Sequence, residues 1–188
     1  MRIHYIIFVS IIFLSFVHCK KKSQISDFES GNSPYLLDSI WKDQNGKETK
    51  LKDFSGKYVL MSMFYSSCDS LCPRIVSDIK KLDSKIPKSK LKETIVVLIS
   101  LDEEKDSTEK MKAYAQKMEL DESRWMLLSG NKDSIRELSA VLEIDYKKME
   151  NGEISHSAVV SLLSKKGEIL AKEKGIGGEF AEILKKLE

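Results

Sequence analysis

Two apolar runs of strand length dominate the pattern of hydrophobic and polar positions along the chain. Residues 58–64 read Tyr-Val-Leu-Met-Ser-Met-Phe, and residues 94–100 read Thr-Ile-Val-Val-Leu-Ile-Ser. Nearly continuous runs of this length are typical of strands that are buried on both faces of a sheet. Shorter runs at 125–128, 158–163 and 168–171 predict three further strands.

Between these strands the apolar positions repeat every three or four residues, which predicts amphipathic helices. The inward positions are Ile75, Ile79, Leu82 and Ile86 in the first helix, Met111, Tyr114, Ala115 and Met118 in the second, and Ile135, Leu138 and Leu142 in the third. Ser107 and Thr108 are suited to cap the second helix, and Asn131 or Asp133 to open the third. A last helix is expected over residues 179–187.

Asparagine–glycine pairs predict two turns. Asn45-Gly46 favours a β-hairpin over about residues 40–51, and Asn151-Gly152 favours a turn shortly before the strand at 158–163. The resulting order is a hairpin, then βαβαβα, then a second hairpin and a closing helix. This order predicts one domain of the α/β class, with a central mixed, mainly parallel sheet, helices on both faces and an N-terminal β-hairpin.

The N-terminal segment differs from the rest of the chain. Residues 6–17 are almost wholly apolar, a length that suits a signal-peptide core better than a transmembrane helix. Cys19 follows directly, which predicts lipoprotein processing at this thiol. We therefore expect a signal peptide over 1–18, a lipidated tether over 19–33 and a folded domain over 34–188.

His18 fits a lipoprotein cleavage site poorly, because a small residue is expected there. An uncleaved N-terminal signal anchor is therefore the alternative. Either route predicts that the domain lies at the extracytoplasmic face of a bacterial membrane and is attached to it through the N-terminus.

The charge balance narrows the classes of partner. The 188-residue chain has 31 Lys and Arg against 29 Asp and Glu, a formal net charge of +2. Nucleic-acid binding usually needs a concentrated basic face, so no nucleic-acid partner is expected. Beyond the N-terminal segment, no stretch of the sequence is long and apolar enough to span a bilayer.

The candidate chemistry lies between the first buried strand and the first helix. If Cys19 carries lipid, Cys68 and Cys72 are the remaining thiols. The carboxyl end of a strand is where such sheets place reactive groups. A helix that begins near Ser70 accommodates Pro73 in its first turn, and its free N–H groups favour thiolate over thiol. Structural thiols or an inert disulfide are the alternative.

His156 is the one histidine left after signal removal. Taken alone, such a histidine is more often a surface or core residue, but its strand is expected beside the cysteine-bearing strand. Two thiolates and an imidazole form a ligand set that favours copper(I), whereas zinc would need a fourth ligand, for which Asp69 is a weak candidate. Thioredoxin-type oxidoreductases carry a cis-proline opposite their cysteines, and none of the three prolines of this chain lies at that place. This argues against plain thioredoxin chemistry.

The chain resembles the Sco/SenC family of thioredoxin-fold copper proteins. The matching features run from Gly56-Lys57 through the C-x-x-x-C-P of Cys68 to Pro73 and on to Ser100-Leu101-Asp102, with His156-Ser157 near the end. The resemblance implies a thioredoxin-like fold and copper bound by Cys68, Cys72 and His156. It also implies copper delivery, or cysteine reduction, at the binuclear copper centre of cytochrome c oxidase. The partner would then be the copper-bearing oxidase subunit, or another copper or thiol protein.

Three positions depart from the family pattern, namely Asp69, Glu103 and Ser155, and none of them is an expected ligand. A copper-binding metallochaperone is the leading hypothesis, with copper(I) as the expected ion and copper(II) left open. A thiol–disulfide oxidoreductase, with Cys68 attacking and Cys72 resolving, is the alternative. Both activities can coexist, because a disulfide between these residues would abolish metal binding.

Overall fold

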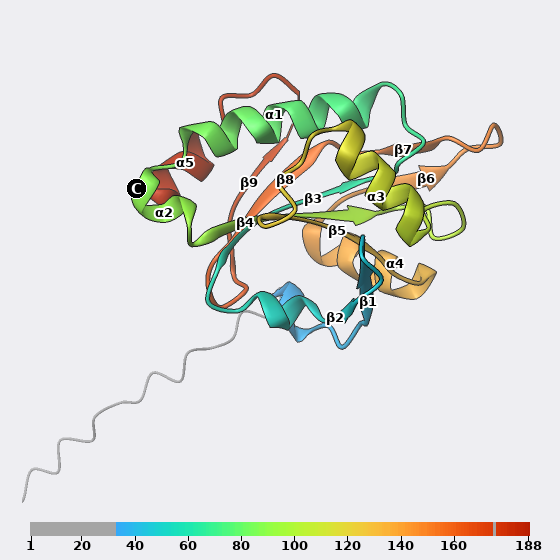
Figure 1. Cartoon of the computed structure of the whole chain (residues 1–188), viewed down its shortest axis with the longest axis horizontal. Helices are drawn as coiled ribbons and strands as arrows, with labels where there is room; N and C mark the ends of the chain where they lie inside the picture. The colour runs from blue at the N-terminus through green and yellow to red at the C-terminus, as the bar shows by residue number, and fades with distance from the viewer. Residues whose placement is uncertain (1–32, 175) are drawn as a thin grey trace, which may run out of the picture.

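The computed structural model describes residues 33–174 and 176–188 (Figure 1). The strands of its main sheet are β1 (Trp41–Asp43), β2 (Glu48–Thr49), β3 (Tyr58–Phe64), β4 (Thr94–Ser100), β5 (Trp125–Ser129), β8 (Val159–Leu163) and β9 (Ile169–Lys174). They lie in the order β2-β1-β5-β4-β3-β8-β9. Every residue of β4 is buried, because this central strand is covered on both faces. The two longest apolar runs therefore form the middle of the sheet, as predicted.

Five α-helices and two short 3₁₀ helices are present in the described part of the chain. They are η1 (Pro34–Leu36), η2 (Leu51–Phe54), α1 (Leu71–Lys85), α2 (Lys88–Leu91), α3 (Thr108–Lys117), α4 (Lys132–Leu142) and α5 (Ala181–Leu187). The Ser107 side chain accepts the N–H of Lys110, and the Asn131 side chain accepts that of Ser134. Each cap satisfies a backbone donor that the first turn of a helix leaves unpaired.

Helices cover both faces of the sheet. Successive residues of a strand point to opposite faces, so the side chains of Met63 and Phe64 lie on the two opposite faces of β3. Met63 contacts Ser139 of α4, whereas the ring of Phe64 lies 5.1 Å from that of Tyr114 on α3. Lys80 of α1 also reaches the end of α3, so α1 and α3 share one face and α4 covers the other (Figure 1).

The predicted mixed sheet is present, but the expectation that it is mainly parallel is wrong. Only the β3–β4 and β4–β5 pairs are parallel, whereas β1–β2, β1–β5, β3–β8 and β8–β9 are antiparallel. Parallel neighbours need a crossover, which α1 and α3 provide. The N-terminal hairpin and the β8–β9 hairpin extend the sheet through short turns, which can join only antiparallel strands.

The Asn151-Gly152 turn joins two strands that form a separate ribbon, β6 (Tyr146–Lys148) and β7 (Ile154–His156). Gly152 adopts a φ of 82°, the left-handed conformation that favours glycine in such a turn. His156 was expected in a strand beside the cysteine-bearing strand. It lies instead at the end of this ribbon, and the next strand, β8, is the one that pairs with β3. We call residues 145–157 the histidine hairpin.

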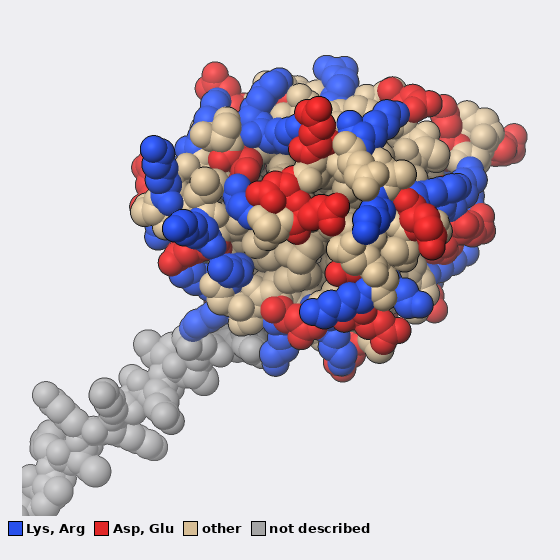
Figure 2. All heavy atoms as spheres, viewed as in Figure 1, with Lys and Arg blue, Asp and Glu red and all other residues tan. Residues whose placement is uncertain are grey.

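The signal peptide, the lipidation of Cys19 and nearly all of the tether fall on residues 1–32, outside the described residues. Within the described residues, no helix is both long and apolar enough to cross a membrane. On the face shown in Figure 2, basic and acidic side chains are interspersed, as the near-balanced composition predicts.

Candidate metal centre

The two candidate thiols lie at the start of α1, beyond the carboxyl end of β3. Cys68 lies in the loop that joins these elements, and Cys72 is the second residue of the helix. The helix begins at Leu71 after Ser70, so Pro73 is its third residue, as the sequence predicts. Cys68 is 6% exposed and Cys72 is fully buried, and neither forms a disulfide.

The two thiols have opposite electrostatic settings. Burial raises the pKa of Cys68, but hydrogen bonds from the backbone at Cys72 and Ser70 outweigh it, and the net pKa is lowered. The N–H of Cys72 lies 3.3 Å from the Cys68 sulfur. The pKa of Cys72 is raised, mainly by burial, and the negative charges of Cys68 and Asp106 add to the effect. In the reduced pair, Cys68 is therefore the thiol that ionises more readily.

The histidine hairpin brings His156 to the second thiol, with its Nε2 atom 3.7 Å from the Cys72 sulfur. The Nδ1 atom lies 3.1 Å from the carbonyl oxygen of Ser157. A carbonyl oxygen only accepts, so Nδ1 carries the proton and Nε2 keeps its lone pair. Burial lowers the pKa of His156, although the Ser157 contact opposes this, and the ring is neutral at pH 7.

The spacing between sulfur and nitrogen suits a shared metal ion. Thiolate sulfur and imidazole nitrogen bind zinc at about 2.3 Å and 2.0–2.1 Å, and these lengths serve as a guide to the distances in such a site. With these bond lengths, a separation of 3.7 Å corresponds to an angle of about 120° at the metal, the value for three-coordination. In residues 33–174 and 176–188, no group of three or more His, Cys, Asp or Glu side chains meets the geometry of a metal site.

A solvent-facing cleft of about 490 Å³ opens between the cysteine loop and the histidine hairpin. Cys68 and His156 line it, with Asp69 and Glu153 as acidic neighbours. Met149, which is 45% exposed, also lines the cleft. Cys68 and His156 are therefore the candidate ligands that line this cleft.

Comparison with known proteins agrees with this geometry. The family model for SCO1/SenC matches residues 32–188.

The chain belongs to the SCO1/SenC family.

Three relatives illustrate the similarity. A Stutzerimonas stutzeri protein named for copper binding is 22% identical over 131 residues, which are 68% of this chain but only 63% of that protein, less than two thirds of its length. ScoI of Arabidopsis thaliana, solved with copper bound, is 18% identical with a TM-score of 0.69, over 79% of this chain and 93% of that one. BsSco, of the Sco family of cytochrome c oxidase assembly proteins, was solved in work that identified a disulfide switch. It is 20% identical with a TM-score of 0.69, over 82% of this chain and 92% of that one.

Two residues near the Sco thiols were missed by the sequence analysis. Tyr65 hydrogen-bonds Cys68, and its ring lies edge-on to that of His156 with centroids 6.2 Å apart. Burial, followed by the Cys68 contact, raises the pKa of Tyr65 to about 12, so it stays a donor at pH 7. Asp106 hydrogen-bonds the loop that carries Cys68. The position of Tyr65 directly after β3 was a usable signal, whereas Asp106 is remote in sequence.

The opposite pKa shifts predict an order of alkylation. Iodoacetamide reacts with thiolate, so Cys68 should be modified first, with a pH midpoint below that of a free thiol. Cys72 should react only at higher pH, because its thiol is buried and its pKa is raised. Mass spectrometry of the metal-free reduced protein over a pH series measures both rates. Faster modification of Cys72 than of Cys68 would contradict the assignment.

Proposed function

We propose that this protein is a copper metallochaperone that carries copper(I) and assists its insertion into the binuclear copper centre of cytochrome c oxidase. One observation carries the proposal: Cys72 and His156, 84 residues apart in sequence, place a sulfur and a nitrogen 3.7 Å apart, with Cys68 beside them. Two relatives support the same function. ScoI of Arabidopsis thaliana was solved with copper bound, and BsSco is a member of the Sco family of cytochrome c oxidase assembly proteins.

In this proposal copper is cargo, and the chain supplies three donors. Cys68 ionises more readily than Cys72, and each thiol gives up its proton when it binds the ion. The neutral Nε2 atom of His156 is the third donor. Two thiolates and one imidazole suit a soft ion of low coordination number. The cleft beside Cys68 leaves one side of the ion open to the ligands of an acceptor.

Copper(I) titration of the reduced protein tests the proposal. We expect copper(I) binding to saturate at about one equivalent per chain, because the three donors can form a single site. Competition with a chromogenic copper(I) chelator measures the affinity, and metal analysis of the washed complex gives the stoichiometry. The disulfide form is the matched control and should not bind. Equal binding by the reduced and disulfide forms would exclude a cysteine-based site.

A thiol–disulfide oxidoreductase is the second candidate, and the lowered pKa of Cys68 beside the raised pKa of Cys72 favours it. Cys68 would attack a partner disulfide and Cys72 would resolve the mixed disulfide, which leaves Cys68–Cys72 oxidised and the partner reduced. Insulin reduction distinguishes the two functions. Rapid turnover that ignores copper and survives His156→Ala would favour the oxidoreductase.

The location also belongs to the proposal. We place the domain on the extracytoplasmic face of a bacterial membrane, attached through a lipid on Cys19 or through an uncleaved N-terminal anchor. Labelling of the protein with a radioactive fatty acid tests the lipid, and Cys19→Ser should abolish it. Membrane association that persists in this variant without label would favour the anchor.

A further inference from the structure

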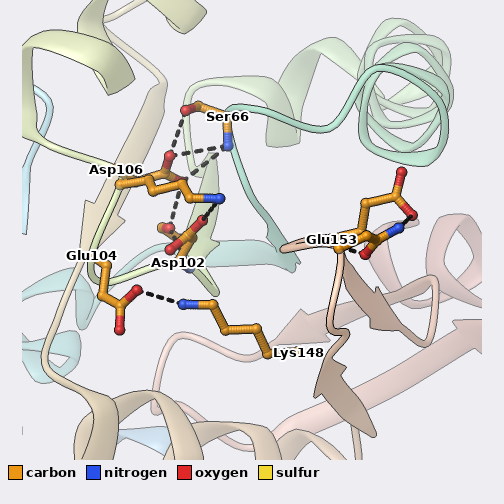
Figure 3. Close-up of polar contacts among 9 residues, drawn as sticks. Ser66, Asp102, Glu104, Asp106, Lys148 and Glu153 are labelled. Atoms are coloured by element: carbon orange, nitrogen blue, oxygen red, sulfur yellow. Dashed lines mark hydrogen bonds and ion pairs between the residues drawn. The ribbon is translucent and has the colours of Figure 1, made fainter.

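The loop between β4 and α3 contacts both segments that carry the candidate ligands. We call residues 101–107 the bridging loop. Figure 3 shows Ser66, on the cysteine side, and Lys148, on the histidine side, both reaching acidic side chains of this loop. Asp106 is 40 residues from Ser66 in sequence, and Glu104 is 44 residues from Lys148.

On the cysteine side the contact is made by Asp106, which is only 2% exposed. The backbone N–H of Ser66 donates to its two carboxylate oxygens, at 3.0 Å and 3.3 Å, and the Ser66 hydroxyl donates as well. The Ser100 hydroxyl donates to the same carboxylate at 2.5 Å. A buried carboxylate is tolerated when it is hydrogen-bonded in this way, and hydrogen bonds to a carboxylate are strong. Ser66 lies two residues before Cys68.

On the histidine side the contact is an exposed ion pair, with Glu104 and the Lys148 ammonium 2.6 Å apart. Lys148 lies on β6 directly opposite Ile154 of β7, two residues before His156. The ammonium group of Lys105 lies at the tip of the same hairpin, near Gly152. Its other neighbour is Asp102, at 4.0 Å, whose buried carboxylate oxygens have no hydrogen-bond partner in the described residues. Asp102 thus retains Lys105 beside the hairpin.

We propose that the bridging loop is a positioning element that sets the distance between the cysteine loop and the histidine hairpin, with Asp106 holding the first and Glu104 the second. This proposal rests on the metal-binding function proposed above. The two attachments differ in strength, because the Asp106 contacts are buried whereas the Glu104–Lys148 pair faces solvent. The cysteines therefore stay fixed, and the histidine hairpin is the part that opens when copper is released.

Asp106→Asn and Ser66→Ala test the cysteine side. Each should weaken copper(I) binding, Asp106→Asn by about 10- to 100-fold, as for other groups that orient metal ligands. The two effects should not add in the double variant, because both act on one contact. Ser66→Ala keeps the charge of Asp106 and loses only the hydroxyl contact, so a smaller loss of affinity in this variant shows that the contact itself matters. An unchanged affinity in Asp106→Asn would overturn the proposal.

Asp83→Asn is the matched control. Asp83 is a half-buried carboxylate that binds Arg124 through two hydrogen bonds near the other end of α1. The Asp83→Asn substitution should lower the free energy of unfolding and leave the copper affinity unchanged. An equal loss of affinity in this variant would show that stability alone is responsible. The alkylation midpoint of Cys68 in metal-free protein should rise in Ser66→Ala, which keeps the charge of Asp106 and loosens the cysteine loop, and stay unchanged in Asp83→Asn. This readout remains informative if the wild type binds no copper.

Glu104→Gln tests the histidine side. Copper transfer to a chelator should accelerate about two- to fivefold, and its dependence on salt should diminish, because an exposed ion pair is weak and screened. The charge swap Glu104→Lys with Lys148→Glu should restore the slow rate. Glu93→Gln is the control, since it breaks another solvent-facing pair, with Lys165, at the opposite end of the sheet.

Hydrogen exchange separates a failure of positioning from a failure of the proposed function. In metal-free protein, Glu104→Gln should speed exchange of the hairpin amides, including that of Ser157, which donates to the Asp145 carbonyl. Faster exchange in a protein that binds no copper would retain the positioning role and reject the metal site. Unchanged exchange together with an unchanged transfer rate would overturn the role of Glu104.

Discussion

Replacing Cys72 with serine is expected to abolish copper(I) binding, with a loss of affinity greater than about 100-fold. Loss of a group that only orients a ligand costs about 10- to 100-fold, so loss of one of the two thiolate donors costs more. Cys72 is the expected donor that contacts both other members of the site, through its N–H to Cys68 and its sulfur to His156. A serine hydroxyl is a hard donor that stays protonated at pH 7, and copper(I) prefers soft thiolate. Chelator competition measures the affinity.

Stability must be controlled because Cys72 is fully buried. A buried hydroxyl without a full set of partners costs about 1–3 kcal/mol of unfolding free energy. Cys72→Ala avoids the hydroxyl and should lose copper binding equally. Ser70→Ala, beside the same helix end, should retain it, since the Ser70 side chain makes no capping hydrogen bond. Binding by either Cys72 variant within about threefold of the wild type would remove this thiol from the site.

Replacing His156 with alanine is expected to weaken copper(I) binding by about 10- to 100-fold without abolishing it. The two thiolates that remain can hold copper(I) in two-coordination, so part of the affinity survives. X-ray absorption should show the loss of the nitrogen neighbour while the sulfur neighbours are retained. Ser155→Ala, an exposed neighbour on the same strand, is the matched control. An unchanged spectrum and affinity in His156→Ala would remove the histidine from the site.

The pH dependence of binding provides a second readout for His156. Burial lowers its pKa below the ordinary 6.5, so the ring is neutral and able to bind at pH 7. Affinity in the wild type should fall gradually as pH falls, because protons compete with the ion for the thiols, and fall more steeply once pH passes below the lowered pKa of His156, because a protonated imidazole has no free lone pair. The steeper fall in affinity that protonation of His156 causes should be absent from His156→Ala, whereas the gradual fall that the thiols cause should remain.

Most elements of the fold were predictable because their signals are local. The runs at 58–64 and 94–100 form β3 and β4 with the same bounds, since near-continuous apolar character has one stable placement, in the middle of a sheet. Ser107 caps α3 because a hydroxyl at that position pairs with a nearby backbone N–H. The prediction failed for β6, a three-residue strand with mostly exposed side chains, because its position depends on pairing with β7.

The larger error was the prediction that most strand pairs are parallel. Like the missed strand β6, it arose because pairing depends on residues far apart in sequence. The alternating order of strands and helices predicts parallel pairs, and it is correct for β3–β4 and β4–β5. The chain between α4 and β8 contains the histidine hairpin rather than a crossover helix, so β8 returns antiparallel to β3. The carboxyl end of β3 and the beginning of β8 therefore lie at the same edge of the sheet. This arrangement brings the histidine hairpin to the cysteines.

The sequence by itself determined which groups can carry chemistry in this Sco protein. The described residues contain two thiols and one imidazole, and the strand-to-helix position of Cys68 and Cys72 follows from local patterning. Only the tertiary structure decided the 3.7 Å approach of His156 to Cys72 and the attachment of Asp106 to Ser66. Both join residues at least 40 positions apart, whose proximity depends on strand pairing and the shared core, and no local pattern of hydrophobic and polar residues encodes such distances.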